Sequence, residues 1–222
     1  MSIPLVCKRS RSFGSDPECQ NLEEKTYPPI KKKMVEKIDV KSEGFLTRDL
    51  PPDLVFAIKN IYTVAGISIN SRPLKEEEKE GEEYKAYRFY IENSDITKHV
   101  AFRVGKVTPS RPGNFVTFWK RPNSVIEPLD ASDGIDFAVV HVSNGERRGQ
   151  FIFDKSTLVT QRIFSDTKNS KKGKLAFRVF PPWSQPAKSA LKTQSWQLKH
   201  FFEIPNSKTL DYARVLRLFK MR

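Results

Sequence analysis

The residue types that most often carry enzyme chemistry are scattered through this 222-residue sequence. His99, His141 and His200 are isolated and lack the spacing of zinc ligands. Cys7 and Cys19 are too few for a disulfide framework or a cysteine-rich zinc site. No phosphate-binding loop, dinucleotide fingerprint or nucleophile elbow is present. The sequence therefore predicts no catalytic residue, no metal and no cofactor, and favours a binding protein over an enzyme.

One set of acidic residues keeps a nuclease open as an alternative. Metal-dependent nucleases hold Mg²⁺ with an acidic helix residue, an Asp on a central strand and an acid-x-Lys element. Glu82 or Glu83, Asp136 and Asp154-Lys155 could supply such a set. The set is incomplete, because no Asp-x-Lys or Glu-x-Lys follows on the strand after Asp136. Asp154 is explained more simply as the N-cap of a turn.

Positive charge is the most informative property of the sequence. The formal net charge is +13, and residues 101–222 hold 22 lysines and arginines against 9 aspartates and glutamates. The whole excess therefore lies in the second half of the chain. A field of one sign draws anionic partners and raises their encounter rate. The alternative is that this charge serves only to keep the protein in solution.

Basic and aromatic residues are interleaved in this half of the chain. A nucleic-acid surface needs this combination, because phosphates supply most of the affinity and aromatic rings stack on any base. Arg103 and Arg178 each stand in a Phe-Arg-Val segment with no obvious acidic partner, which favours an anion as the partner. We predict binding of nucleic acid, or of another polyanion, without sequence specificity. The residues predicted to form this surface are Arg103, Lys106, Lys120, Arg121, Lys172, Lys174, Arg178, Trp183, Lys192 and Trp196.

Hydrophobic periodicity predicts the elements that must position these residues. Apolar residues recur at helical spacing over about 51–63, after a Pro-Pro-Asp start. Six segments rich in Phe, Val, Ile, Tyr and Trp then predict strands at 84–92, 99–107, 114–121, 135–143, 149–153 and 174–180. The segment 135–143 is apolar on both faces and should be a central strand. The predicted fold is α+β, with one mainly antiparallel sheet of about six strands packed with helices.

Two helices are predicted after the last strand. The first begins at Pro186-Ala187, has Phe201 and Phe202 in its apolar stripe, and carries Lys192 and Trp196 on a basic face. The second is amphipathic and ends the chain. These features divide the sequence into a disordered polar and basic leader over 1–45, an α+β domain over 46–204 and a C-terminal helix over 205–222.

Five segments, in this order, resemble the motifs of the MepB family. They are FRVGKVTP at 102–109, GNFVTFWKR at 113–121, GQFIF at 149–153, RVFPPW at 178–183 and KTQSWQ at 192–197. The resemblance covers about residues 50–204. It implies an α+β fold of the kind found in small soluble bacterial proteins, one of which is encoded beside a multidrug efflux pump and its repressor. It implies no particular reaction.

The partners and location follow from what the sequence lacks. No apolar run approaches the roughly 20 residues that span a bilayer, and the first residues lack the apolar core of a secretory signal. We therefore expect a cytoplasmic protein without a membrane partner, although basic clusters in the leader could direct it to the nucleus of a host cell. A third alternative is an interaction protein or effector with no nucleic-acid role, which binds a protein partner through the leader or the C-terminal helix.

Overall fold

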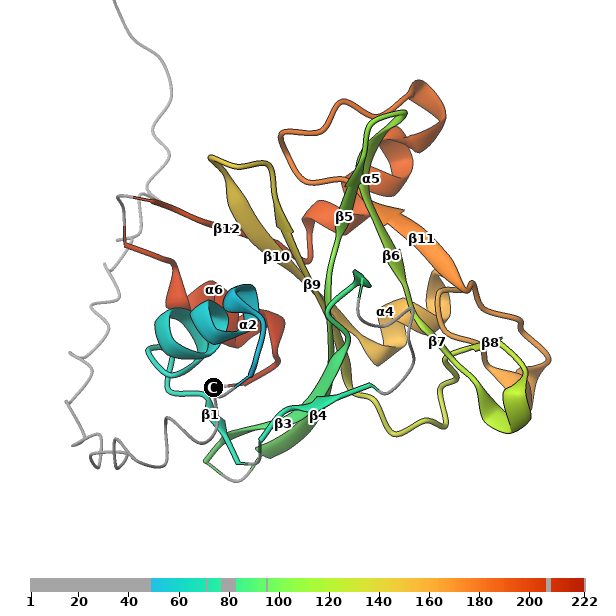
Figure 1. Ribbon diagram of the computed structural model, residues 1–222, viewed down its shortest axis with the longest axis horizontal. Coiled ribbons are helices and arrows are strands. Elements are labelled where there is room, and N and C mark those ends of the chain that lie inside the picture. Colours follow the sequence, from blue (N-terminus) through green and yellow to red (C-terminus); the bar gives the residue numbers. More distant parts are fainter. Residues whose placement is uncertain (1–48, 71, 77–82, 95, 207–208, 222) are drawn as a thin grey trace, which may run out of the picture. The chain divides into compact units, whose positions relative to one another are not determined.

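The computed structural model describes residues 49–70, 72–76, 83–94, 96–206 and 209–221 (Figure 1). The leader predicted over 1–45, with both cysteines, lies outside these residues, and so does Glu82. No helix in the described part of the chain is long and apolar enough to cross a membrane.

The larger sheet has seven strands and is mixed. Its strands follow the order β1 (Ser68–Ile69), β3 (Tyr87–Asn93), β4 (Ile96–Val104), β9 (Phe137–Ser143), β10 (Arg148–Asp154) and β12 (Phe201–Ile204), and β2 (Leu74–Lys75) also pairs with β3. Neighbouring strands are antiparallel except β4 and β9, which are parallel. Strand β9 is buried from Phe137 to Val142. This confirms the prediction that the segment apolar on both faces forms a central strand.

Helices cover one face of this sheet. They are α2 (Pro52–Ala57), the π-helix η1 (Ile58–Tyr62) and α6 (Tyr212–Leu218). The first two confirm the helix predicted over 51–63. Val215 and Phe219 of the C-terminal segment pack with Phe137 and Val139 of β9 in one hydrophobic cluster, so this segment shares the core of the sheet (Figure 1).

The other face is covered by a second sheet and by short helices. This sheet has the order β11 (Ala176–Val179), β6 (Arg111–Thr117) and β5 (Lys106–Thr108), and the helices are α4 (Lys155–Thr160) and α5 (Leu191–Leu198). Val140 and Val142 of β9 pack here with Val116 and Phe118. Alternate residues of β9 therefore serve two cores, as the two-residue period of a strand requires.

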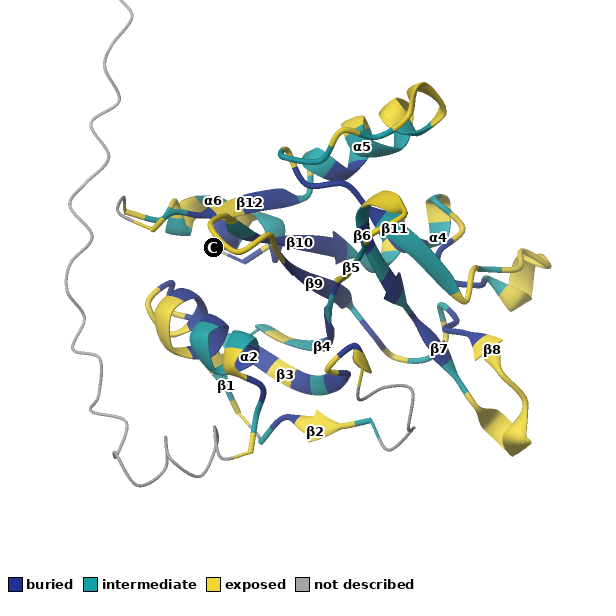
Figure 2. Cartoon of the chain, turned by 45° about the horizontal axis from the view of Figure 1, so that its top comes forward, coloured by how far each residue is buried: buried dark blue, intermediate teal, exposed yellow. Residues whose placement is uncertain are grey.

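A small hairpin extends from the second sheet. It joins β7 (Trp119–Lys120) to β8 (Glu127–Pro128), and short 3-10 turns lie at Pro122–Ser124, Thr167–Asn169 and Lys188–Ala190. Figure 2 shows buried residues along the two sheets and exposed residues at the tip of this hairpin. The hairpin is thus one of the more solvent-exposed parts of the described chain.

The α+β class is confirmed, and the sheets differ from the prediction in detail. The strand pairs are mainly antiparallel, as predicted, with one parallel pair, but the strands fall into three sheets rather than one. The segment predicted as one strand over 99–107 breaks at Gly105, between β4 and β5. A Cβ at Gly105 would lie 2.8 Å from the Cβ of Asn114, so glycine lets the chain pass from one sheet to the other.

The helix predicted to run from Pro186 through Phe202 is wrong at its C-terminal end. Helix α5 ends at Leu198, and Phe201–Ile204 forms β12. Phe202 and Ile204 lie in the cluster under the helices, whereas Phe201 lies in the cluster under the second sheet. The apolar period at this point is therefore two residues, which is typical of a strand with two buried faces.

Arg103 lies between the two sheets and not on a surface. Its side chain is buried, its Nε donates to the carbonyl of Thr117 at 3.2 Å, and its Nη2 lies 2.7 Å from Oε2 of Glu76. Arg88 donates to the other oxygen of Glu76 at 2.8 Å. Although burial alone would raise the pKa of Glu76, the two guanidinium groups hold it below its ordinary value. The predicted role of Arg103 in anion binding, and its lack of an acidic partner, are therefore corrected.

We expect Arg103→Met to lower the free energy of unfolding by about 3 to 5 kcal/mol, because it leaves one oxygen of the largely buried Glu76 carboxylate and the Thr117 carbonyl without their donor. Urea unfolding measures this loss. Arg178→Met, at a half-buried arginine without a carboxylate partner in the described chain, is the matched control and should cost about 1 kcal/mol or less. Equal losses in the two variants would contradict the structural role of Arg103.

Candidate functional site

Two of the predicted residues form a row across the outer face of the three-stranded sheet. Phe115 on β6 is the register partner of both Lys106 on β5 and Arg178 on β11. Residues that are paired directly across antiparallel strands point to the same face. The guanidinium of Arg178 lies 5.5 Å from the centre of the Phe115 ring, a distance typical of a cation–π contact.

The guanidinium of Arg178 is held by the β5–β6 turn. Its Nη2 donates to Oγ1 of Thr108 at 2.8 Å, and its Nη1 lies 3.4 Å from the carbonyl oxygens of Pro112 and Gly113. Gly113 has φ +79°, and a Cβ there would lie 2.6 Å from the Phe180 ring. The turn therefore needs glycine in order to place these carbonyls beside the arginine.

Arg178 and Arg111 are neighbouring cations, and the described residues include no carboxylate that pairs with either. Partial burial lowers the pKa of Arg178, and the positive charge of Arg111 lowers it further. Neither arginine forms an ion pair with a carboxylate in the described part of the chain. Two adjacent cations that lack a counter-charge disfavour each other unless an external anion lies between them.

Lys106 differs from Arg178 in having a carboxylate partner. Its Nζ donates to Oε1 of Glu83, and this hydrogen bond raises the pKa of Lys106. Both side chains are about half exposed. Lys106 is therefore placed at the edge of the row, with its charge already matched by Glu83.

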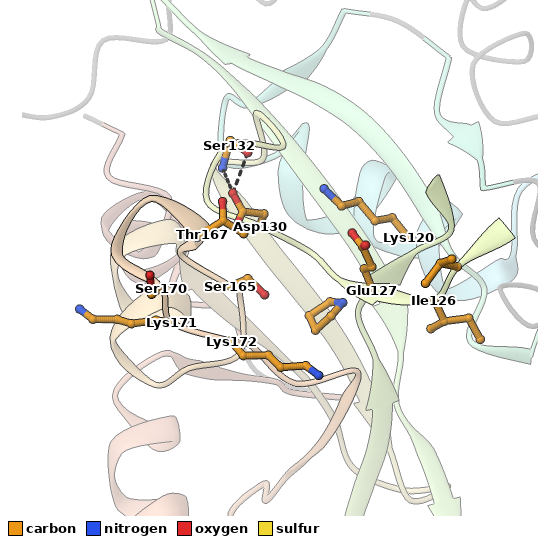
Figure 3. Close-up of a pocket in the computed structure, with 12 residues that line it drawn as sticks. Lys120, Ile126, Glu127, Asp130, Ser132, Ser165, Thr167, Ser170, Lys171 and Lys172 are labelled. Carbon is orange, nitrogen blue, oxygen red and sulfur yellow. Dashed lines mark hydrogen bonds between the residues drawn. The ribbon is translucent and has the colours of Figure 1, made fainter. Parts of the chain in front are cut away.

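A cavity of about 560 Å³ lies between the β7–β8 hairpin and the loop that precedes β11 (Figure 3). It contains two of the predicted residues, Lys120 and Lys172. Its lining combines lysines, hydroxyl groups, two carboxylates and three apolar side chains, namely Lys120, Val125, Ile126, Glu127, Pro128, Asp130, Ser132, Ser165, Thr167, Ser170, Lys171 and Lys172. Lys120 donates to Oδ1 of Asp133, whereas Lys171 and Lys172 have no carboxylate partner among the described residues.

Asp130 links the β7–β8 hairpin to the lysine loop, which is the segment before β11 that contains Lys171, Lys172 and Lys174. One carboxylate oxygen accepts from the backbone and hydroxyl of Ser132 at 2.9 and 2.6 Å, and the other accepts from the backbone N–H of Thr167 at 3.0 Å. Burial would raise the pKa of Asp130, but these hydrogen bonds lower it to about 2. The carboxylate is therefore ionised and fixed at neutral pH, and it acts as a positioning residue for the loop.

A second cavity, of about 190 Å³, brings together three further predicted residues. Lys174, Arg178 and Trp196 line it, and they come from the lysine loop, β11 and α5. The segment from Gln161 to Lys174 contributes to both cavities. The lysine loop therefore lines both cavities, and Arg178 of β11 belongs both to the second cavity and to the row on the outer face of the three-stranded sheet.

Gln197 fixes α5 to the edge of this site. Its side chain is buried, accepts from the N–H of Phe180 at 2.9 Å and donates to the carbonyl of Arg178 at 2.8 Å. One backbone group of β11 and one of the residue that follows it, which would otherwise bind a neighbouring strand, are satisfied by one amide side chain. Gln197 is therefore structural, and it determines where Trp196 lies.

The remaining predicted residues are less well placed. Trp183 lies under the guanidinium of Arg147, 4.8 Å from its ring centre, and Arg147 is itself paired with Glu203. One face of Trp183 is therefore already occupied. Arg121 lies beside Trp119 on the exposed hairpin, and Lys192 is exposed on α5.

Two of the acidic residues of the nuclease alternative, Asp136 and Asp154, line another cavity, of about 790 Å³, together with Lys98, Lys155 and Lys220. Glu83 does not line it and is paired with Lys106. Asp136 lies 3.8 Å from Lys98, and Asp154 lies 3.3 Å from Lys220. Asp154 also accepts from the N–H of Thr157 at 2.9 Å, which confirms its prediction as an N-cap. Within the described residues, no three His, Cys, Asp or Glu side chains gather as metal ligands.

Arg111, Asp130 and Lys171 are among the residues of the site that were not predicted. Arg111 lies in a turn marked by Pro109 and Gly113, and Lys171 is adjacent to the predicted residue Lys172. The sequence could therefore have indicated both, as basic residues in or beside a turn. Asp130 precedes Ser132 in an Asp-x-Ser pattern that favours side-chain to backbone hydrogen bonds.

We expect Asp130 to make stability depend on acid pH. Its pKa in the folded protein is about 2, below the ordinary value of 3.8, so its contribution is present above about pH 4 and is lost as the pH falls toward 2. Asp130→Asn should therefore show a flatter fall in unfolding free energy over this range than the wild type does. Hydrogen exchange supplies a local measurement, because the Thr167 amide should exchange faster in the variant. Unchanged pH dependence and unchanged exchange would contradict this role.

Comparisons with other proteins identify the family. A search among curated proteins finds no match. A family model described as MepB-like matches residues 78–203. The crystal structure of MepB is similar to this chain, with a TM-score of 0.56 and 27% sequence identity over 76% of this chain and 99% of that one. Because the family model matches more than half of the sequence, and as its five motifs predicted, the chain belongs to the MepB-like family.

Proposed function

We propose that this protein binds nucleic acid without sequence specificity, through a basic surface formed by Arg111, Arg178, Lys171, Lys172, Lys174 and Lys192. Lysine and arginine groups on such a surface bind phosphates, which supply affinity independent of sequence. The cytoplasmic location expected from the sequence belongs to the same proposal.

The observation that carries this proposal is the paired arrangement of Arg178 and Arg111. Arg178 is oriented by Thr108 and by backbone carbonyls, and it neighbours a second arginine without any carboxylate in the described part of the chain. A guanidinium held in this way is ready to bind a phosphate with little further loss of side-chain freedom.

Several sites along one surface favour a polyanion over a single phosphate. Lys171 and Lys172 line the cavity beside the β7–β8 hairpin, and Lys174 and Trp196 line the cavity of about 190 Å³. Lys192 lies on the same short helix as Trp196. Repeated cations match the repeated charges of a nucleic-acid backbone. The indole of Trp196 is half-buried and packs against Phe153, and the part of it that lines the cavity is where a base would stack.

The lack of sequence specificity follows from the short helices. The longest α-helix in the described chain is α5, with eight residues, and its Gln197 is buried against β11. A recognition helix that reads base edges in the major groove must present a free face to the DNA. We therefore expect backbone contacts to dominate.

We expect Arg111→Ala/Arg178→Ala to weaken binding to single- and double-stranded DNA and RNA by about 10- to 100-fold at low salt, because two phosphate contacts are lost. The slope of log affinity against log salt should fall by about 2 for duplex probes. Fluorescence anisotropy of labelled oligonucleotides over a salt series measures both quantities.

The matched control is Lys59→Ala/Arg217→Ala, which removes two exposed charges on the helices that cover the other face of the large sheet. It should bind like the wild type. Equal weakening in both double variants would contradict a localised surface. No binding to any probe at low salt would overturn the proposal and favour a protein-interaction role.

A Mg²⁺-dependent nuclease is the second candidate, favoured by Asp136 and Asp154 lining one cavity with three lysines. Such an enzyme should cut the same probes with Mg²⁺ and not with EDTA, and Asp136→Asn should abolish the cutting. Gel analysis of the probes after each titration measures this. Intact probes in all conditions would remove the nuclease candidate and leave the binding proposal unaffected.

A further inference from the structure

The cavity beside the β7–β8 hairpin contains more chemical groups than phosphate binding requires. Its volume of about 560 Å³ is within the range of roughly 300 to 1,000 Å³ in which small-molecule sites fall. Two lysines without carboxylate partners in the described chain accompany a free carboxylate and an apolar wall. The ligand that fits best must therefore combine an anionic group, hydrogen-bond donors and a flat apolar part.

The apolar wall comes from the β7–β8 hairpin. Val125 and Ile126 are large apolar side chains that are 57% and 44% exposed, and Pro128 lines the same cavity. Burial of such adjacent aliphatic groups by a planar ligand is favourable at about 25 cal/mol per Å² of apolar surface. A nucleobase has the size and the flat face needed to cover them.

An anionic group of a ligand would bind on the side of the cavity formed by the lysine loop. Figure 3 shows Lys172 extending across the cavity toward the β8 side, whereas Lys171 points away from it. Ser170 and Thr167 add hydroxyl groups to the lining of the same cavity. An ammonium group together with hydroxyl donors is suited to a phosphate.

The carboxylate of Glu127 would not favour the binding of a phosphate alone. Its exposed side chain lines the cavity and forms no ion pair in the described part of the chain. A carboxylate repels phosphate, but it accepts hydrogen bonds from sugar hydroxyls. The 2′-hydroxyl is the group by which a protein distinguishes RNA from DNA.

We propose that this cavity takes one ribonucleotide unit, with its phosphate at Lys172, its ribose hydroxyls at Glu127 and its base against Val125 and Ile126. This inference rests on the proposed function and names the part of the nucleic acid that enters the cavity. The unit is either a free ribonucleotide or one nucleotide of an RNA strand, since both carry the same three groups.

The test is calorimetric titration of the full chain with AMP, UMP, dAMP and inorganic phosphate, followed by oligo(U) and oligo(dT). We expect AMP and UMP to bind, and dAMP to bind about tenfold more weakly because a hydrogen bond to a charged acceptor is lost. Glu127→Gln should weaken AMP and bring the ratio of AMP to dAMP affinity close to one. Lys172→Ala should weaken AMP and dAMP equally.

The matched control is Lys168→Ala, a neighbouring exposed lysine that does not line the cavity, which should leave AMP binding unchanged. Equal affinity for AMP and dAMP, or an unchanged ratio in Glu127→Gln, would overturn the inference. Polymers that bind through the arginine pair while mononucleotides do not bind would also overturn it, and would leave the proposed function standing. Mononucleotides that bind as expected, with no polymer bound, would support a free-ribonucleotide site while the proposed function fails.

Discussion

The burial of one arginine between two sheets is the constraint on which the arrangement of this protein depends. Arg103 begins on β4 of the large sheet, reaches the carbonyl of Thr117 at the end of β6 in the second sheet, and pairs with Glu76 after β2. A charge at this depth is tolerated only if its donors are satisfied together. The relative position of the sheets is therefore fixed by hydrogen-bond geometry as well as by hydrophobic packing.

This fixed frame allows exposed loops to carry the candidate site. The second sheet packs through Val116, Phe118 and Val179 against the large one, so its opposite face and its connecting loops are directed outward. Asp130 and Gln197 then position the loop and helix at the two ends of this face. Both residues satisfy backbone groups that have no strand beside them, which explains why polar side chains at these points are buried or half-buried.

Hydrophobic periodicity predicted an element correctly where the apolar residues fit only one secondary structure. It failed where the same residues fit both a helix and a strand. The two-sided apolar pattern of β9 identified the central strand, because burial on both faces leaves no ambiguity. Phe201 and Phe202 follow a helix directly and also fit its stripe, so only the tertiary structure assigns them to a strand. The sequence does not show which basic residues are already paired with a carboxylate. The partner of Arg103 is 27 residues away in sequence and becomes its neighbour only after the sheet has formed.

The amide of Gln197 has a consequence for solubility. An edge strand with free N–H and C=O groups is a template for the strand of another molecule, and natural proteins protect such edges in several ways. Strand β11 is the edge of its sheet, and part of its free side is occupied by a side chain that imitates a strand. A single amide thus reduces the risk that β11 extends into an intermolecular sheet, and it does so without a further strand that would cover the basic residues beside it.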